Sequence, residues 1–181
     1  MDPSQVFIDP MTFKEGELTF ILCNDAQGML GWFIKWFTKD NYCHEMLSRK
    51  PGFVCSQNNM YEEVPISNYL KSSEGLKFYR IANLTQDEFY LINKTIDVDL
   101  QAPWWQRMYN YPGLIAQSIP WLKNWFSMPY QNICSQRCAR YKRLLPRLVP
   151  ITLEHPSPAD EDESVMANPG LLPVLGYWWK D

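Results

Sequence analysis

Cys134 has the side chain and the position for nucleophilic chemistry. Asn132 is a good N-cap, and it predicts a helix from Ile133 to about Leu145. The unpaired N–H groups and the dipole at a helix start favour a thiolate, and Arg137 on the next turn would add to this effect. Such a thiolate could attack a carbonyl carbon if a base accepted the thiol proton. The alternative is a buried cysteine that only fills space in the core.

The candidate bases are the two histidines of the chain, His44 and His155. His155 lies in the proline-rich stretch 146–158, where an incidental role fits better. His44 lies inside a predicted strand, residues 42–47. A histidine in a strand is more often a core residue than a catalyst, so His44 has both interpretations.

A predicted β-hairpin follows His44. Residues 48–52 contain Pro51 and Gly52, which supply the fixed φ and the positive φ that a tight turn needs. Residues 53–57 then form the returning strand. We expect the turn to be centred on Lys50 and Pro51.

This hairpin offers a polar partner for the imidazole. The expected turn places Gln57 opposite His44, with Ser56 as the one-residue alternative. Either side chain could hold the imidazole in the tautomer that a base requires. Glu45 is expected on the opposite face of the strand, because strand side chains alternate.

The other cysteines favour structural roles. Cys138 lies one helical turn after Cys134 and is predicted to pack in the core. A zinc site made of Cys43, His44, Cys134 and Cys138 is disfavoured, because Cys43 and His44 alternate across a strand and the usual C-x2-C spacing is absent. Five cysteines at irregular spacing do not indicate a disulfide framework. We expect no cofactor and no metal.

Mixed strands and helices must position these residues. Strands are expected at 17–24, 42–47, 53–57 and 76–81, and helices at 28–38, from Thr85 and from Ser157. Thr85 and Glu88 form a capping box, and Pro158 with acidic residues suits a helix start. Residues 66–70 are expected to be short and irregular, and 104–126 to form a loop and a helix under the site.

Composition narrows the class of protein. The chain has 181 residues, a formal net charge of -3 and 46% hydrophobic residues, which indicates one domain with a real core. This charge argues against a nucleic-acid partner, and the basic stretch 137–147 is interpreted as the solvent-exposed face of a helix. The longest apolar run, 29–37, is too short to span a bilayer. Residues 1–10 show no signal peptide, so we expect synthesis in a reducing cytoplasm, with virion packaging as a possible exit route.

Six motifs, in this order, resemble the circularly permuted branch of the papain-like NlpC/P60 superfamily, which includes YiiX-like and bacteriophage proteins. They are GELTFIL at 16–22, WFIKWFTKDNYCHEML at 32–47, PGFVCSQ at 51–57, YNYPGLIAQ at 109–117, NICSQRCARYKRLL at 132–145 and SPADEDES at 157–164. In that group the histidine precedes the cysteine. Gln136 departs from the pattern, because a Glu is common there.

The resemblance implies an α+β papain-like fold, circularly permuted, with an antiparallel sheet and the nucleophile helix packed against it. It implies a domain at 1–165, and residues 166–181 then form an apolar segment that docks on the domain or binds a partner. By position, Cys134 is the nucleophile, His44 the base, and Gln57 or Ser56 the orienting residue. The implied activity is hydrolysis or acyl transfer at an amide or ester, with a cell-wall peptide of peptidoglycan as first substrate. The alternative is an inactive structural or interaction protein, such as a phage virion component.

Overall fold

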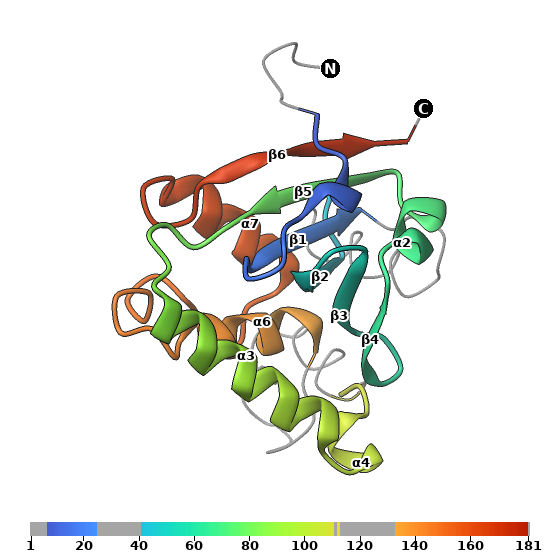
Figure 1. Cartoon of the computed structure of the whole chain (residues 1–181), viewed down its shortest axis with the longest axis vertical. Coiled ribbons are helices and arrows are strands. Elements are labelled where there is room, and N and C mark those ends of the chain that lie inside the picture. Colours follow the sequence, from blue (N-terminus) through green and yellow to red (C-terminus); the bar gives the residue numbers. More distant parts are fainter. Residues whose placement is uncertain (1–6, 25–40, 111, 113–132, 181) are drawn as a thin grey trace.

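A six-stranded antiparallel sheet organises the protein (Figure 1). The computed structural model describes residues 7–24, 41–110, 112 and 133–180. The strand order is β4-β3-β2-β1-β5-β6. The strands are β1 (Thr19–Asn24), β2 (His44–Lys50), β3 (Phe53–Gln57), β4 (Tyr61–Pro65), β5 (Gly75–Tyr79) and β6 (Val174–Trp179). The helix expected at 28–38, the Asn132 cap and most of 104–126 lie outside the described residues.

Helices cover both faces of the sheet. None of the helices in the described ranges is long and apolar enough to cross a membrane. They are η1 (Pro10–Thr12), α2 (Ser67–Ser72), α3 (Gln86–Gln101), α4 (Trp104–Arg107), α6 (Cys134–Lys142) and α7 (Pro158–Ala167). Helices α3, α6 and α7 lie on one side of the sheet and α2 on the other (Figure 1). The α+β class expected from the sequence is therefore confirmed.

Strand alternation builds two cores. Phe20 and Leu22 of β1 point toward α3, α6 and α7, where they join Ile92 and Tyr141. Between them, Ile21 points to the other face, where Phe13 and Tyr69 cover it. A central strand buried on both faces reads as continuous apolar sequence. The strand expected at 17–24 is therefore confirmed as β1, with every residue from Thr19 to Asn24 buried.

Two helix starts match their predicted caps. The Thr85 hydroxyl accepts the Glu88 N–H at 3.3 Å, and the Glu88 carboxylate accepts the Thr85 N–H at 2.9 Å. At α7 the Ser157 hydroxyl accepts the Asp160 N–H at 3.2 Å. Pro158 occupies the first turn, where its missing N–H costs nothing.

The hairpin turns one residue later than expected. Its central residues are Pro51 and Gly52, with Lys50 paired to Phe53, and Gly52 has φ 73°. Proline at the second and glycine at the third position of a turn suit a type II geometry. An irregularity between Leu47 and Lys50 then shifts the pairing again. Together, the later turn and this irregularity produce a pairing of β2 with β3 that differs from the one expected from the sequence.

The C-terminal apolar segment is part of the sheet. Residues 174–179 form β6, which pairs with β5 along its whole length, so this segment docks on the domain. The N-terminal strap, residues 7–18, also reaches β6, because the Ile8 N–H donates to the Tyr177 carbonyl at 2.9 Å. Strands β4 and β6 were not expected from the sequence, and residues 67–72 form a short helix.

Gly75 is required where β5 meets β6. A Cβ at Gly75 would overlap the indole ring of Trp179. We predict that Gly75→Ala lowers the free energy of unfolding by about 1–3 kcal/mol, as overpacking does. Gly170→Ala is the control, because a Cβ there meets nothing within 4 Å. Urea unfolding followed by tryptophan fluorescence measures both variants, and equal stability of the two would contradict the prediction.

Candidate functional site

His44 is held by a chain of polar side chains. It is the first residue of β2, and its Nε2 lies 2.8 Å from Ser56 Oγ on β3. Ser56 Oγ is hydrogen-bonded to the Tyr69 hydroxyl, and Asn58 Nδ2 donates to that same hydroxyl at 2.7 Å. The imidazole also stacks on the Tyr69 ring, with 5.7 Å between centroids and 14° between planes. The ring of His44 is therefore fixed both in its plane and on one face.

The partner of His44 is Ser56, so the preference for Gln57 is wrong by one residue. Met46 pairs with Ser56 across the two strands, and His44 shares a face with Met46 because strand side chains alternate. Gln57 points to the opposite face, where its Nε2 donates to the Arg107 carbonyl at 2.7 Å. The irregularity between Leu47 and Lys50, which shifts the pairing by one residue, is the physical cause of this difference.

Cys134 is the first residue of α6, and its side chain is buried, with 2% of its surface exposed. Gln136 fixes this helix start, because its Oε1 accepts the Ile133 N–H at 3.1 Å. The Gln136 Nε2 also lies 3.2 Å from Nδ1 of His155, the second histidine. Gln136 therefore has a structural role at the start of α6.

The sulfur of Cys134 lies against the first residues of β2. The backbone N–H of Glu45, the residue directly after His44, forms a hydrogen bond with this sulfur. The thiol and the imidazole thus come from segments that touch, although they are far apart in the sequence. The imidazole lies on the α2 face with Met46 and Tyr69, whereas α6 covers the other face.

The thiol has a high pKa in this conformation. Burial raises the pKa of Cys134 to about 12, although the Glu45 N–H lowers it. The expected low pKa is therefore wrong for the structure as it stands. Arg137 does not assist, because its Nη1 lies 3.2 Å from Asp99 Oδ2 and its guanidinium lies 4.3 Å from the Tyr61 ring centroid.

The imidazole is uncharged at neutral pH. Burial lowers the pKa of His44 from 6.5 to about 4. With the pKa of the Cys134 thiol raised and that of the His44 imidazole lowered, both groups are uncharged at neutral pH. The resting protein therefore holds no thiolate–imidazolium ion pair.

A buried ionic cluster ties α6 to β2 and α7. Lys142 Nζ lies 3.3 Å from Glu45 Oε1 and 3.0 Å from the Tyr79 hydroxyl, and it also contacts the Glu161 carboxylate. Burial raises the pKa of Glu45 to about 8. Burial alone would lower the pKa of Lys142, but Glu161 and Glu45 raise it, so the ammonium stays charged. One ammonium serves two carboxyls, and Glu45 retains its proton through most of the neutral range.

The sequence interpretation missed this cluster. It treated 137–147 as a solvent-exposed helix face, but the side chains of Arg137 and Lys142 are 3% and 0% exposed. The missed signal is helical spacing, because Cys134, Cys138 and Tyr141 define a buried stripe into which Lys142 falls. The core role expected for Cys138 is confirmed, since it packs in the α6-side core.

In the described part of the chain, no three His, Cys, Asp or Glu side chains gather around a point that could hold an ion. Cys43 packs with Tyr109 and Ile133. None of the five cysteines forms a disulfide, and each one is buried.

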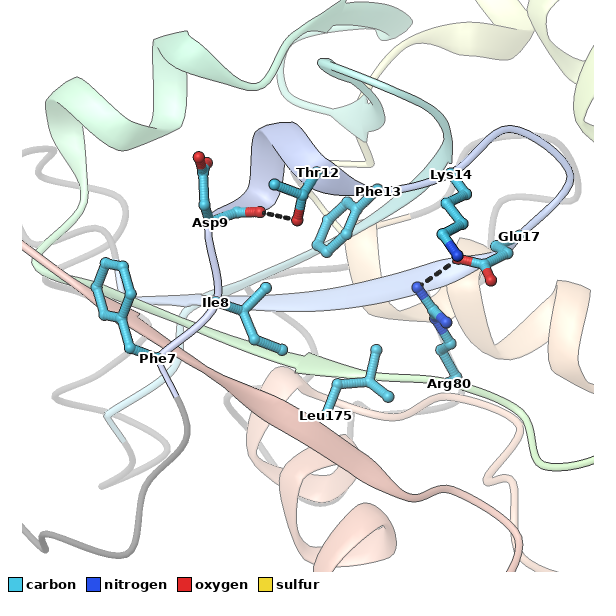
Figure 2. A pocket seen from close by; sticks show the side chains of 9 residues that line it. All are labelled: Phe7, Ile8, Asp9, Thr12, Phe13, Lys14, Glu17, Arg80 and Leu175. Atoms are coloured by element: carbon cyan, nitrogen blue, oxygen red, sulfur yellow. Dashed lines mark hydrogen bonds and ion pairs between the residues drawn. The ribbon is translucent and has the colours of Figure 1, made fainter.

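An open hollow of about 420 Å³ lies beside the N-terminal strap (Figure 2). Ile8, Phe13 and Leu175 line it, together with Arg80 and Glu17, whose Nη2 and Oε2 atoms are 2.7 Å apart. Neither the thiol nor the imidazole described above lines it. The hollow is therefore separate from the candidate site.

Comparison with known proteins supports the fold. No family model and no curated protein sequence matches the chain. Among solved structures, the crystal structure of the metalloprotein YiiX from Escherichia coli O157:H7 is similar, with a TM-score of 0.53 and 14% sequence identity. The match covers 93% of this chain and 100% of that one. The chain therefore has a YiiX-like fold, and at this identity the likeness concerns the fold alone.

The Lys142 cluster is testable by substitution. Lys142→Met leaves the Glu45 and Glu161 carboxyls buried without their ammonium, and we predict a loss of about 3–5 kcal/mol in the free energy of unfolding. Lys94→Met, at an exposed position of α3, is the control and should change it by less than about 0.5 kcal/mol. Urea unfolding measures both variants. A Lys142→Met protein as stable as the control variant would refute the role of the cluster.

The lowered pKa of His44 predicts a pH-dependent stability. Between pH about 6.5 and about 4 the unfolded chain binds a proton at His44 that the folded protein does not, so stability is lost as pH falls through this window. The variant His44→Gln should lack this part of the slope, whereas His155→Gln should keep it. Unfolding free energies at pH 7 and pH 5 give the comparison. A slope that survives in His44→Gln would contradict the assignment.

Proposed function

We propose that the protein is a cysteine-dependent hydrolase or acyltransferase, with Cys134 as nucleophile and His44 as base. The observation that carries the proposal is the meeting of the two segments. The Cys134 sulfur takes the N–H of Glu45, while the neighbouring His44 is held by Ser56. Nucleophilic catalysis requires a held histidine within hydrogen-bonding reach of the thiol, and the contact between these two segments supports such an arrangement.

The proposed reaction uses both nitrogens of the imidazole. Nε2 is hydrogen-bonded to Ser56, so Nδ1 is the nitrogen that takes the proton from the Cys134 thiol. The sulfur then attacks the carbonyl carbon of the substrate. The negative charge that develops on the carbonyl oxygen is stabilised by N–H groups at the start of α6. His44 returns its proton to the leaving amine or alcohol, and a thioester remains on Cys134.

Water, or a second nucleophile in a transferase, completes the cycle. His44 takes a proton from this molecule as its oxygen attacks the thioester carbon, and the Cys134 sulfur leaves and recovers the proton. Because the resting pair is neutral, the proton moves together with the attack on the carbonyl. No preformed thiolate is needed.

The substrate that we propose is an amide in a cell-wall peptide of peptidoglycan. This choice follows from the resemblance of the motifs at 32–47 and 132–145 to the permuted NlpC/P60 group, and the YiiX-like fold supports that resemblance. The papain-like identity and the circular permutation are parts of the same proposal.

A second candidate is an interaction protein that keeps this fold without catalysis, for example in a virion. Two observations favour it. The Cys134 thiol is buried and has a raised pKa, which reduces its reactivity. Trp104 and Trp105 are 64% and 44% exposed, as residues at a protein interface often are in the free protein.

A chromogenic ester separates the two candidates. With p-nitrophenyl butyrate, the hydrolase should release a burst of nitrophenolate equal to the enzyme concentration, and mass spectrometry should locate the acyl group on Cys134. We predict that Cys134→Ala and His44→Ala lose the burst, a fall of at least about 100-fold in rate. Ser56→Ala should lower the rate without abolishing it.

Cys138→Ala is the matched control, because it removes a thiol from the same helix face. It should keep the burst and lose stability, since Cys138 packs in the core. No burst in the wild-type protein, or an equal burst in Cys134→Ala, would refute the proposed nucleophile. A mixture of peptidoglycan stem peptides analysed by mass spectrometry then tests the substrate class.

A further inference from the structure

The side chains behind His44 form a directed hydrogen-bond chain. Asn58 Nδ2 donates to the Tyr69 hydroxyl oxygen at 2.7 Å, and an amide nitrogen can only donate. The Tyr69 hydroxyl is bonded to Ser56 Oγ, and Ser56 Oγ lies 2.8 Å from His44 Nε2. These four groups run in one line from the exposed Asn58 to the imidazole.

Between Asn58 and His44 Nε2, only one proton arrangement gives every donor a described acceptor. Tyr69 accepts from Asn58, so its own proton goes to Ser56. Ser56 then donates its proton to Nε2 of His44, and the neutral imidazole carries its proton on Nδ1. In the reverse arrangement Ser56 donates to Tyr69, and the Tyr69 proton has no acceptor among the bonds that the structure describes at this hydroxyl. A buried donor without a partner costs about 1–3 kcal/mol, so the first arrangement is favoured.

We propose that Asn58 sets the direction of this chain and thereby selects the tautomer of His44, which makes Asn58 and Tyr69 positioning residues of the site. In the resting protein the proton is on Nδ1, the nitrogen that the proposed reaction uses as base. The resting imidazole therefore cannot accept the Cys134 proton at that nitrogen.

The chain can also reverse when a ligand binds. Asn58 is exposed, so a carbonyl oxygen of a substrate can displace its amide and accept the Tyr69 hydroxyl proton. The Tyr69 oxygen then accepts from Ser56, and Ser56 accepts from His44 Nε2–H. This reversal leaves Nδ1 as the acceptor. The catalytic consequence rests on the proposed function, whereas the choice of tautomer does not.

Asn58→Asp tests the direction of the chain. A carboxylate only accepts, so it draws the Tyr69 proton toward itself and reverses every bond behind it. In protein labelled with 15N at histidine, long-range 1H–15N correlation spectra at pH 7 distinguish the two tautomers. We expect Nδ1–H in the wild-type protein and Nε2–H in Asn58→Asp.

Three control variants distinguish the effect of the hydrogen-bond chain from the effects of added charge and of altered packing. Asn68→Asp adds the same charge at an exposed position next to Tyr69 and should leave the tautomer unchanged. Tyr69→Phe keeps the stacked ring but removes the hydroxyl, so both tautomers should be populated. Tyr61→Phe removes a different buried hydroxyl, whose partner is Tyr141, and should leave Nδ1–H in place.

Nε2–H in the wild-type protein would overturn the inference, as would an unchanged tautomer in Asn58→Asp or a changed one in Asn68→Asp. The spectra need no activity. A tautomer that reverses in a protein without an ester burst would therefore sustain this inference while refuting the proposed function.

Discussion

The ammonium of Lys142 is the constraint on which the rest of the site depends. It is fully buried, and it joins α6 to β2 through Glu45 and to α7 through Glu161. A buried charge must be paired, so these elements cannot slide past one another without exposing an uncompensated group. Because Cys134 starts the helix that Lys142 ends, this contact fixes the position of the thiol relative to the first residues of β2.

The His44 ring is held in place on the other face of the sheet. There the His44 ring is stacked on Tyr69 and bonded to Ser56, and burial keeps it neutral. The two halves of the proposed site are therefore positioned by different cores, and they meet at the start of β2. A buried thiol and a neutral imidazole can remain unreactive until a substrate changes their hydrogen bonds. The proposed function is thus compatible with a thiol whose pKa is high at rest.

Local rules predicted much of this structure, and pairing between distant segments decided the rest. The Thr85 cap, the strand 53–57 and the helix start at Pro158 depend on neighbouring residues, and the sequence shows them directly. Ser56 rather than Gln57 faces His44 because the irregularity between Leu47 and Lys50 shifts the pairing by one residue, and a slip of one residue changes the face of a strand. Strand β6 was not predicted because Gly176 interrupts its strand pattern. The burial of Lys142 depends on two carboxyls that no local pattern brings to it.

The complete burial of the five thiols makes them natural reporters of local opening. An alkylating reagent reaches a buried sulfur only when the surrounding structure opens, and such openings differ in free energy from one region to another. Cys23 and Cys55 belong to the sheet, Cys134 to the start of α6, and Cys138 to the core beneath it. The order in which reagents modify them would therefore map which parts of the native protein open first.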